Sequence, residues 1–105
     1  MFIDGERVDA HSGKTFDVTN PATGEHLGAV PDGNAIDAEV AVAAATAAFA
    51  TWSQTTAYER ADILMNAWRL MGERSEELAA LMTAEQGKPL RASRAEVNYL
   101  SLIHI

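Results

Sequence analysis

A Gly-Lys-Thr triplet near the start of the sequence could in principle bind phosphate. Gly13-Lys14-Thr15 has the form of the end of a phosphate-binding loop, in which a lysine and a hydroxyl meet phosphate and magnesium. That loop needs a glycine five residues earlier, where this chain has Val8, and a helix afterwards, where Thr15–Val18 favours a strand. We therefore interpret Gly13-Lys14-Thr15 as a hairpin turn.

The titratable side chains form no catalytic or metal-binding pattern. His11, His26 and His104 lie in a predicted turn, a predicted strand and the C-terminal tail, without metal-ligand spacing or a partner nucleophile. Glu76 and Glu77 are neighbours in the first turn of a predicted helix, where the helix dipole favours negative charge. We interpret the histidines as surface or packing residues and the glutamates as solvated surface.

Composition excludes several classes of function. The sequence has no cysteine and no Gly-x-Gly pair, so this stretch offers no disulfide, no thiolate ligand or nucleophile and no glycine-rich dinucleotide turn. The net charge of -7 disfavours nucleic acid and anionic membranes. We find no secretory leader and no apolar run near the roughly 18 residues of a membrane helix. These features predict a soluble, cytoplasmic protein without nucleic acid or membrane partners.

The first thirty residues predict strands separated by turns. Asp4-Gly5 is a hairpin signal because glycine adopts positive φ without steric cost. We expect one small antiparallel meander, ended by Pro31–Asn34, whose β-like runs are Phe2-Ile3, Arg7-Val8, Thr15–Val18 and His26–Val30.

A first helix is predicted over Ala35–Trp52, with Asn34 as its N-cap. At 100° per residue its apolar residues fall on two opposite faces. One face holds Ile36, Val40, Ala43 and Ala47, and the other holds Val42, Ala45, Phe49 and Trp52. A helix of this kind needs neighbours on both sides.

Further helices follow, so the isolated chain is predicted to be a single α+β unit with three to four helices. The second helix starts with a capping box at Thr56–Glu59 and ends near 72–74. Its stripe from Trp68 to Met71 is interpreted as core. The third helix has Ser75 as its cap and stops at Gly87, and a fourth begins at Pro89 and reaches about Tyr99.

Several short motifs, in order and in register over residues 2 to 99, resemble the start of the aldehyde dehydrogenase superfamily. The Leu81-Met82-Thr83 triplet before the last of them is most similar to succinate-semialdehyde dehydrogenases. The motifs are Phe2–Val8, Gly13–Phe16, Asn20–Glu25, Ala41–Phe49 with Trp52, Glu59–Ala61, Glu77–Ala79 and Glu85–Leu90.

The resemblance implies an enzyme that oxidises an aldehyde to its carboxylic acid with NAD or NADP. A cysteine thiolate attacks the carbonyl, amide donors hold the oxyanion, and a glutamate-activated water releases the acid. In the family these groups and the cofactor turn come later in the chain, so we expect no catalytic and no cofactor-binding residue here and an inactive fragment. The complete enzyme is expected to be a homodimer or homotetramer, with residues 1–99 as the N-terminal part of a Rossmann-like α/β cofactor-binding domain.

Some family members also hold a monovalent cation. By match of position, its ligands here are the main-chain carbonyls of Val18 and Thr19 and the carboxylate of Glu85. The alternative interpretation is that Glu85 is a surface residue at a helix end.

Residues 100–105 depart from the family pattern, and we expect a non-family tail after Tyr99, with a C-terminal strand as the alternative. Two other functional hypotheses remain for the chain. One is a stand-alone α+β module that acts by association through exposed apolar faces, without catalysis. The other is a small acidic ligand-binding domain.

Overall fold

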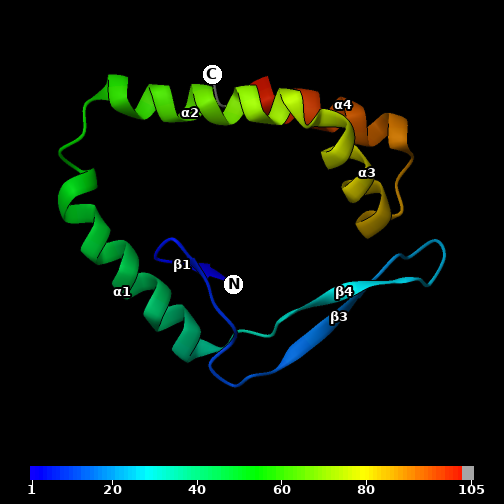
Figure 1. The fold of residues 1–105 in the computed structure, drawn as a ribbon, viewed down its shortest axis with the longest axis horizontal. Helices are drawn as coiled ribbons and strands as arrows, with labels where there is room; N and C mark the ends of the chain where they lie inside the picture. The colour runs from blue at the N-terminus through cyan, green and yellow to red at the C-terminus, as the bar shows by residue number, and fades with distance from the viewer. Residues whose placement is uncertain (103–105) are drawn as a thin grey trace. The chain divides into compact units, whose positions relative to one another are not determined.

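The structure, a computed structural model, describes residues 1–102 and is drawn in Figure 1. Within those residues, short strands are followed by four helices, which confirms the α+β class. The chain divides into two compact units. The first comprises Met1–Val18 and Gly28–Thr55, and the second comprises Thr19–Leu27 and Thr56–Ile105.

The strands form two separate pairs where the sequence suggested one meander. Strand β1 (Phe2–Ile3) pairs antiparallel with β2 (Glu6–Arg7), with Phe2 opposite Arg7. Positive φ angles of 53° at Asp4 and 80° at Gly5 build the tight turn between them, as the sequence predicted. Strand β3 (Thr15–Thr19) pairs with β4 (His26–Pro31) in the second sheet.

A buried carboxylate fixes the start of helix α1 (Ala35–Trp52) in the first unit. Asp37 is 7% exposed, and its Oδ1 accepts a hydrogen bond from the main-chain N–H of His11 at 2.8 Å. Its Oδ2 accepts one from the N–H of Asn34 at 2.8 Å, and the Asn34 side chain accepts from the N–H of Ile36 at 2.8 Å. Asn34 is therefore the predicted N-cap, and Asp37 completes a capping box.

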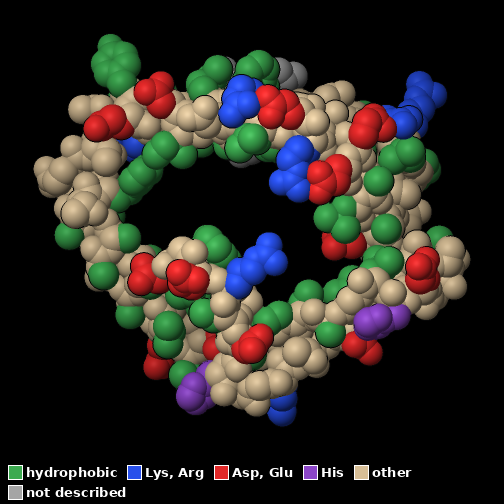
Figure 2. Space-filling model, viewed as in Figure 1, with side chains coloured by type: hydrophobic (Ala, Val, Ile, Leu, Met, Phe, Trp, Pro, Cys, Tyr) green, Lys and Arg blue, Asp and Glu red, His purple; other side chains and the backbone are tan. Residues whose placement is uncertain are grey.

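The two apolar faces of α1 are exposed, as Figure 2 shows for many hydrophobic side chains of the chain. Val40 on one face is 54% exposed, and Val42 and Phe49 on the other are 64% and 65% exposed. A third strip, which the sequence analysis missed, carries Ala41 and Ala44 on the side that faces β1. This unit therefore covers α1 with a few strand residues only.

One expectation about α1 was wrong. No apolar run near membrane length was expected from the sequence, yet α1 has 18 residues with a mean hydropathy of 1.3 and is long and apolar enough to cross a membrane by length and composition. A helix that is apolar all round is also what a layered protein core requires. Length and composition do not separate these two settings.

Helix α2 (Ala57–Glu73) begins with the predicted capping box. The N–H of Glu59 donates to the Thr56 hydroxyl at 3.2 Å, and the N–H of Thr56 donates to the Glu59 carboxylate at 2.7 Å. The core interpretation of its aromatic stripe does not hold within this chain. Trp68 is 37% exposed and Met71 is half-buried, because the main contacts of α2 are with α3 and α4 and these leave part of the stripe uncovered.

The second unit has its core where α3 (Ser75–Gln86) packs on α4 (Leu90–Leu102). Ala79 and Ser93 are fully buried, and Val97 is 3% exposed. The small side chains at 79 and 93 let the two backbones approach closely. The hydroxyls of Thr83 and Ser93 satisfy each other in a hydrogen bond of 2.8 Å, so burying Ser93 leaves no unpaired polar atom.

The ends of α3 and α4 differ from the predictions in detail. Arg74, not Ser75, occupies the N-cap of α3 and makes no side-chain cap, because a guanidinium group has no acceptor for the first-turn N–H groups. It pairs instead with Glu77 at 2.6 Å. Helix α4 begins one residue after Pro89, whose carbonyl accepts the N–H of Ala92 at 2.8 Å. It runs to Leu102, so residues 100–102 of the predicted tail are helical and the strand alternative was wrong for them. Residues 103–105, with His104, lie outside the described residues.

Gly87 ends α3 in the left-handed region at φ 70°, as predicted. Its N–H donates to the carbonyl of Thr83 at 2.9 Å. A Cβ added at Gly87 would lie 2.9 Å from Cγ of Pro21, in the loop between β3 and β4. Both the backbone conformation and the close contact therefore require glycine here.

Substitution of Gly87 tests whether the turn at the end of α3 requires glycine. We expect Gly87→Ala to lower the free energy of unfolding by about 1–3 kcal/mol, because alanine is strained at positive φ and its Cβ collides with Pro21. Gly72→Ala is the matched control, since no atom lies within 4 Å of its added Cβ and Gly72 is in α2. Urea unfolding followed by circular dichroism measures both variants. Equal losses in the two would contradict this account of the corner.

Acid sensitivity tests the carboxylate at the start of α1. The hydrogen bond from the N–H of Asn34, then that from His11, holds the pKa of Asp37 below its usual 3.8. A carboxyl with a lowered pKa stabilises the folded state at pH values above its pKa in the unfolded chain. This stabilisation is lost as the pH falls through its pKa in the folded chain. We expect Asp37→Asn to lower the thermal midpoint at neutral pH and to flatten its decline between about pH 4 and about pH 2.

Asp32→Asn makes the same chemical change at an exposed aspartate that precedes the same helix. It should leave both the neutral midpoint and the acid slope near those of the parent chain. A steeper or unchanged acid slope in Asp37→Asn would show that the carboxylate is not what fixes the helix start.

Candidate functional site

The predicted cation ligands come from the end of β3 and the end of α3. Thr19 is exposed at the last position of β3, and Glu85 is exposed in the last turn of α3. Both belong to the second unit, whereas half-buried Val18 belongs to the first. The coordination of a cation by these three residues stays a prediction.

Hydrogen bonds within the β3–β4 loop shape the chain after Thr19. The N–H of Ala22 donates to Oδ1 of Asn20 at 2.9 Å, and the N–H of Gly24 donates to the carbonyl of Asn20 at 2.8 Å. The ring of Pro21 then lies against Gly87, two residues after Glu85. The loop after Thr19 therefore packs on the turn at Gly87, which follows Glu85.

The C-terminal end of α3 has uncompensated negative charge. Its last carbonyls form the negative end of the helix dipole, Glu85 adds a carboxylate there, and the last turn contains no basic residue. Within residues 1–102, the Glu85 carboxylate has no ion pair. Lys88, the nearest base in sequence, instead pairs with Glu96 of α4. This arrangement favours a bound cation electrostatically.

A hollow of about 230 Å³ adjoins Glu85. It is mainly apolar, and its polar edge is Glu85 and Gln86. The hollow holds no nucleophile with an adjacent base, so it does not form a catalytic site. Its apolar lining comes from Met71, Leu78, Leu81, Met82 and Val97.

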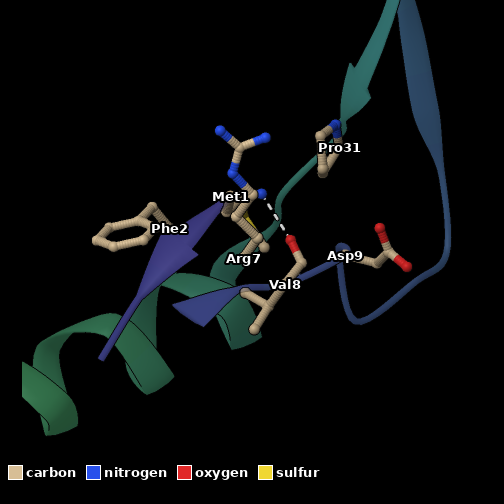
Figure 3. Close-up of a pocket in the computed structure, with 6 residues that line it drawn as sticks. All are labelled: Met1, Phe2, Arg7, Val8, Asp9 and Pro31. Carbon is tan, nitrogen blue, oxygen red and sulfur yellow. Dashed lines mark hydrogen bonds between the residues drawn. The ribbon is translucent and has the colours of Figure 1, made fainter. Parts of the chain in front are cut away.

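A larger hollow of about 580 Å³ lies in the first unit and is drawn in Figure 3. The N-terminal ammonium of Met1 donates to the carbonyl of Val8 at 2.6 Å along one wall. Arg7 and Asp9 are its charged side chains, and Phe2 and Pro31 are apolar neighbours. None of these groups pairs a nucleophile with a base, the arrangement that covalent catalysis requires.

The other residues considered from the sequence lie in turns and strands. Gly13, at φ 67°, turns the chain with its N–H on the carbonyl of Ala10 at 2.8 Å, and β3 follows, which confirms a turn in place of a phosphate loop. His11 lies in a turn and His26 in β4. Among residues 1–102, no group of three or more His, Cys, Asp or Glu is arranged to hold a metal ion.

The adjacent glutamates of α3 are solvated, as expected, but they also form ion pairs. Glu76 accepts a bidentate pair from Arg94 of α4, with distances of 2.8 to 3.1 Å, and Glu77 pairs with Arg74. The hydrogen bonds from these guanidinium groups lower the pKa of both carboxyls. In Figure 2, acidic and basic side chains lie next to one another along the helices of this unit.

Two functional contacts were missed from the sequence. The spacing Asn34-x-x-Asp37 is a capping-box signal that could have indicated the hydrogen bonds of Asp37. The Lys88–Glu96 pair joins a loop to the next helix, and no local spacing rule predicts it.

Comparison with known proteins agrees with the fold and the motifs. Over 96 residues the chain is 53% identical to the 3-sulfolactaldehyde dehydrogenase of Pseudomonas putida, covering 91% of this chain and 20% of that enzyme. It is 48% identical over 97 residues to the succinate-semialdehyde dehydrogenase [NADP(+)] GabD of Escherichia coli (strain K12), covering 92% of this chain and 20% of that enzyme.

A solved structure is also similar to this chain in fold and sequence. The crystal structure of an E. coli NADP-dependent enzyme superposes with a TM-score of 0.96 at 46% identity, over 98% of this chain and 21% of that one. The chain thus spans about a fifth of the length of the relatives that it matches. Residues 8–104 match the aldehyde dehydrogenase family. The chain belongs to the aldehyde dehydrogenase family.

Proposed function

We propose that residues 1–99 form the N-terminal part of the Rossmann-like cofactor-binding domain of an NAD(P)-dependent aldehyde dehydrogenase. The family match extends to residue 104, past the Tyr99 boundary at which the sequence suggested a non-family tail. The observation that carries the proposal is the superposition, at a TM-score of 0.96, on a fifth of an NADP-dependent enzyme. The uncovered faces of α1 support it, because a layer on each side is what a larger α/β domain supplies.

The overall reaction converts an aldehyde, water and NAD(P)⁺ into a carboxylic acid, NAD(P)H and a proton. A bound NAD(P)⁺ would supply the hydride acceptor. This chain offers no thiol for the covalent step and no glycine-rich turn for the pyrophosphate, so its residues do not fit either role. The 105-residue chain by itself is therefore inactive. Its part in the reaction is to position the rest of the domain.

The substrate class follows from the two relatives described above. Succinate semialdehyde carries a carboxylate and 3-sulfolactaldehyde carries a sulfonate, each in addition to the aldehyde. We assign to the complete enzyme an aldehyde with a second, anionic group, with succinate semialdehyde as the first compound to test. The complete enzyme acts in the cytoplasm as a homodimer or homotetramer, without nucleic acid or membrane partners.

A monovalent cation at the carbonyls of Val18 and Thr19 and the carboxylate of Glu85 is part of the proposal. Oxygen donors of this kind suit a hard cation. The negative end of α3, with Glu85 in its last turn and no base there, supports a structural cation at this position. It would neutralise the carboxylate.

The alternative is a stand-alone module that acts by association without catalysis. The exposure of Val42 and Phe49 on α1 favours it as much as it favours a missing layer. An experiment must therefore ask whether this segment functions inside a complete enzyme.

A chimaera tests the proposed role. In the chimaera, residues 8–99 replace the matched segment of the E. coli succinate-semialdehyde dehydrogenase. The purified chimaera is assayed for oxidation of succinate semialdehyde with NADP, measured by the absorbance of the reduced cofactor. We expect kcat/KM within roughly tenfold of the parent enzyme, because cores tolerate substitutions that keep volume and pattern. The unmodified 105-residue chain should show no turnover.

Two matched lysine variants of the chimaera test whether the apolar face of α1 that carries Phe49 is buried in the complete enzyme. Phe49→Lys places a charge on an apolar face and should abolish soluble activity, since an unpaired buried charge is costly. Thr46→Lys introduces the same residue on the strip of α1 that carries Glu39, and should be tolerated. An inactive chimaera, or equal tolerance of both lysines, would contradict the proposed role and favour the association module.

A further inference from the structure

Lys88 lies three residues after Glu85 and makes its ion pair elsewhere. Its Nζ donates to Oε2 of Glu96, on α4, and its side chain is only 23% exposed. Glu96 is 43% exposed by its side chain, so the pair is partly desolvated. Removing one partner of such a pair leaves the other charge uncompensated in a partly desolvated position.

Without Glu96, Lys88 would have one carboxylate close in sequence. Gly87 turns the chain at φ 70° directly before Lys88, and Glu85 stands in the last turn before that corner. A lysine near the last turn of a helix is also attracted to its carbonyls. The ammonium group, released from α4, would therefore compete for the charge at the end of α3.

We propose that Glu96 is a positioning residue for the cation site: by binding Lys88, it keeps the ammonium group away from Glu85 and leaves that carboxylate available to a monovalent metal cation. The inference rests on the cation site of the proposed function. It assigns to the Lys88–Glu96 pair a role in charge placement beyond joining the corner to α4.

The two ion pairs between the α3 region and α4 provide a matched comparison. Arg94 pairs with Glu76 at the start of α3, far along the helix from Glu85. Breaking that pair removes a contact between α3 and α4 but releases no cation near Glu85. Breaking the Lys88–Glu96 pair also removes a contact with α4, but it releases the Lys88 ammonium group near Glu85.

The test is the stabilisation of the 105-residue chain by potassium, read as the difference in thermal midpoint between potassium chloride and tetramethylammonium chloride at equal ionic strength. We expect a potassium-dependent rise in the parent chain and its loss in Glu85→Gln. In Glu96→Gln the potassium concentration for half of the rise should increase on the order of tenfold. In Lys88→Met with Glu96→Gln it should return to the parent value, because the competing ammonium is gone.

Glu76→Gln should lower the midpoint in both salts and leave the potassium response unchanged. A Glu96→Gln chain that keeps the parent's potassium response overturns the inference and leaves the cation site standing. A double variant that is not rescued also overturns it, since the pair would then be only a structural contact. A parent chain without any potassium response overturns both the cation site and the inference, while the chimaera tests aldehyde oxidation independently.

Discussion

Helix α1 carries apolar side chains on two opposite faces, and covering both of them requires a layer of structure on each side. In the first unit, β1 packs against the strip with Ala41 and Ala44, and the His11 turn is hydrogen-bonded to Asp37. Val42 and Phe49 stay exposed on the face turned away from Val40, which is itself exposed. Membership of the aldehyde dehydrogenase family, over a fifth of the relatives' length, gives this surplus of apolar surface a physical reason.

The elements that could be predicted are those specified by neighbouring residues. Asn34 and Thr56 accept hydrogen bonds from their own first turns, so the starts of α1 and α2 follow from short patterns. Gly87 ends α3 because glycine adopts its left-handed backbone angle without strain and, having no Cβ, leaves room for Pro21. The absence of cysteine was equally readable from the sequence.

Features that depend on distant partners could not be predicted. The hydrogen bond from His11 to Asp37 joins residues 26 apart, and the pairing of Lys88 with Glu96 depends on how α4 returns along α3. Trp68 has the spacing of a core residue but lacks the layer that would bury it. The candidate cation site was indicated by resemblance alone. Its electrostatic basis, a carboxylate at the negative end of α3 whose neighbouring lysine is bound elsewhere, emerged from the fold.

Amide hydrogen exchange of the purified chain, diluted until sedimentation shows a monomer, tests most directly whether this segment leaves α1 uncovered. The account predicts slow exchange where α3 packs on α4, around the buried Ala79 and Ser93, and fast exchange through the middle of α1, from Val42 to Phe49. Exchange in α1 as slow as in α3 would contradict it, because the chain's own residues would then be covering both faces of that helix.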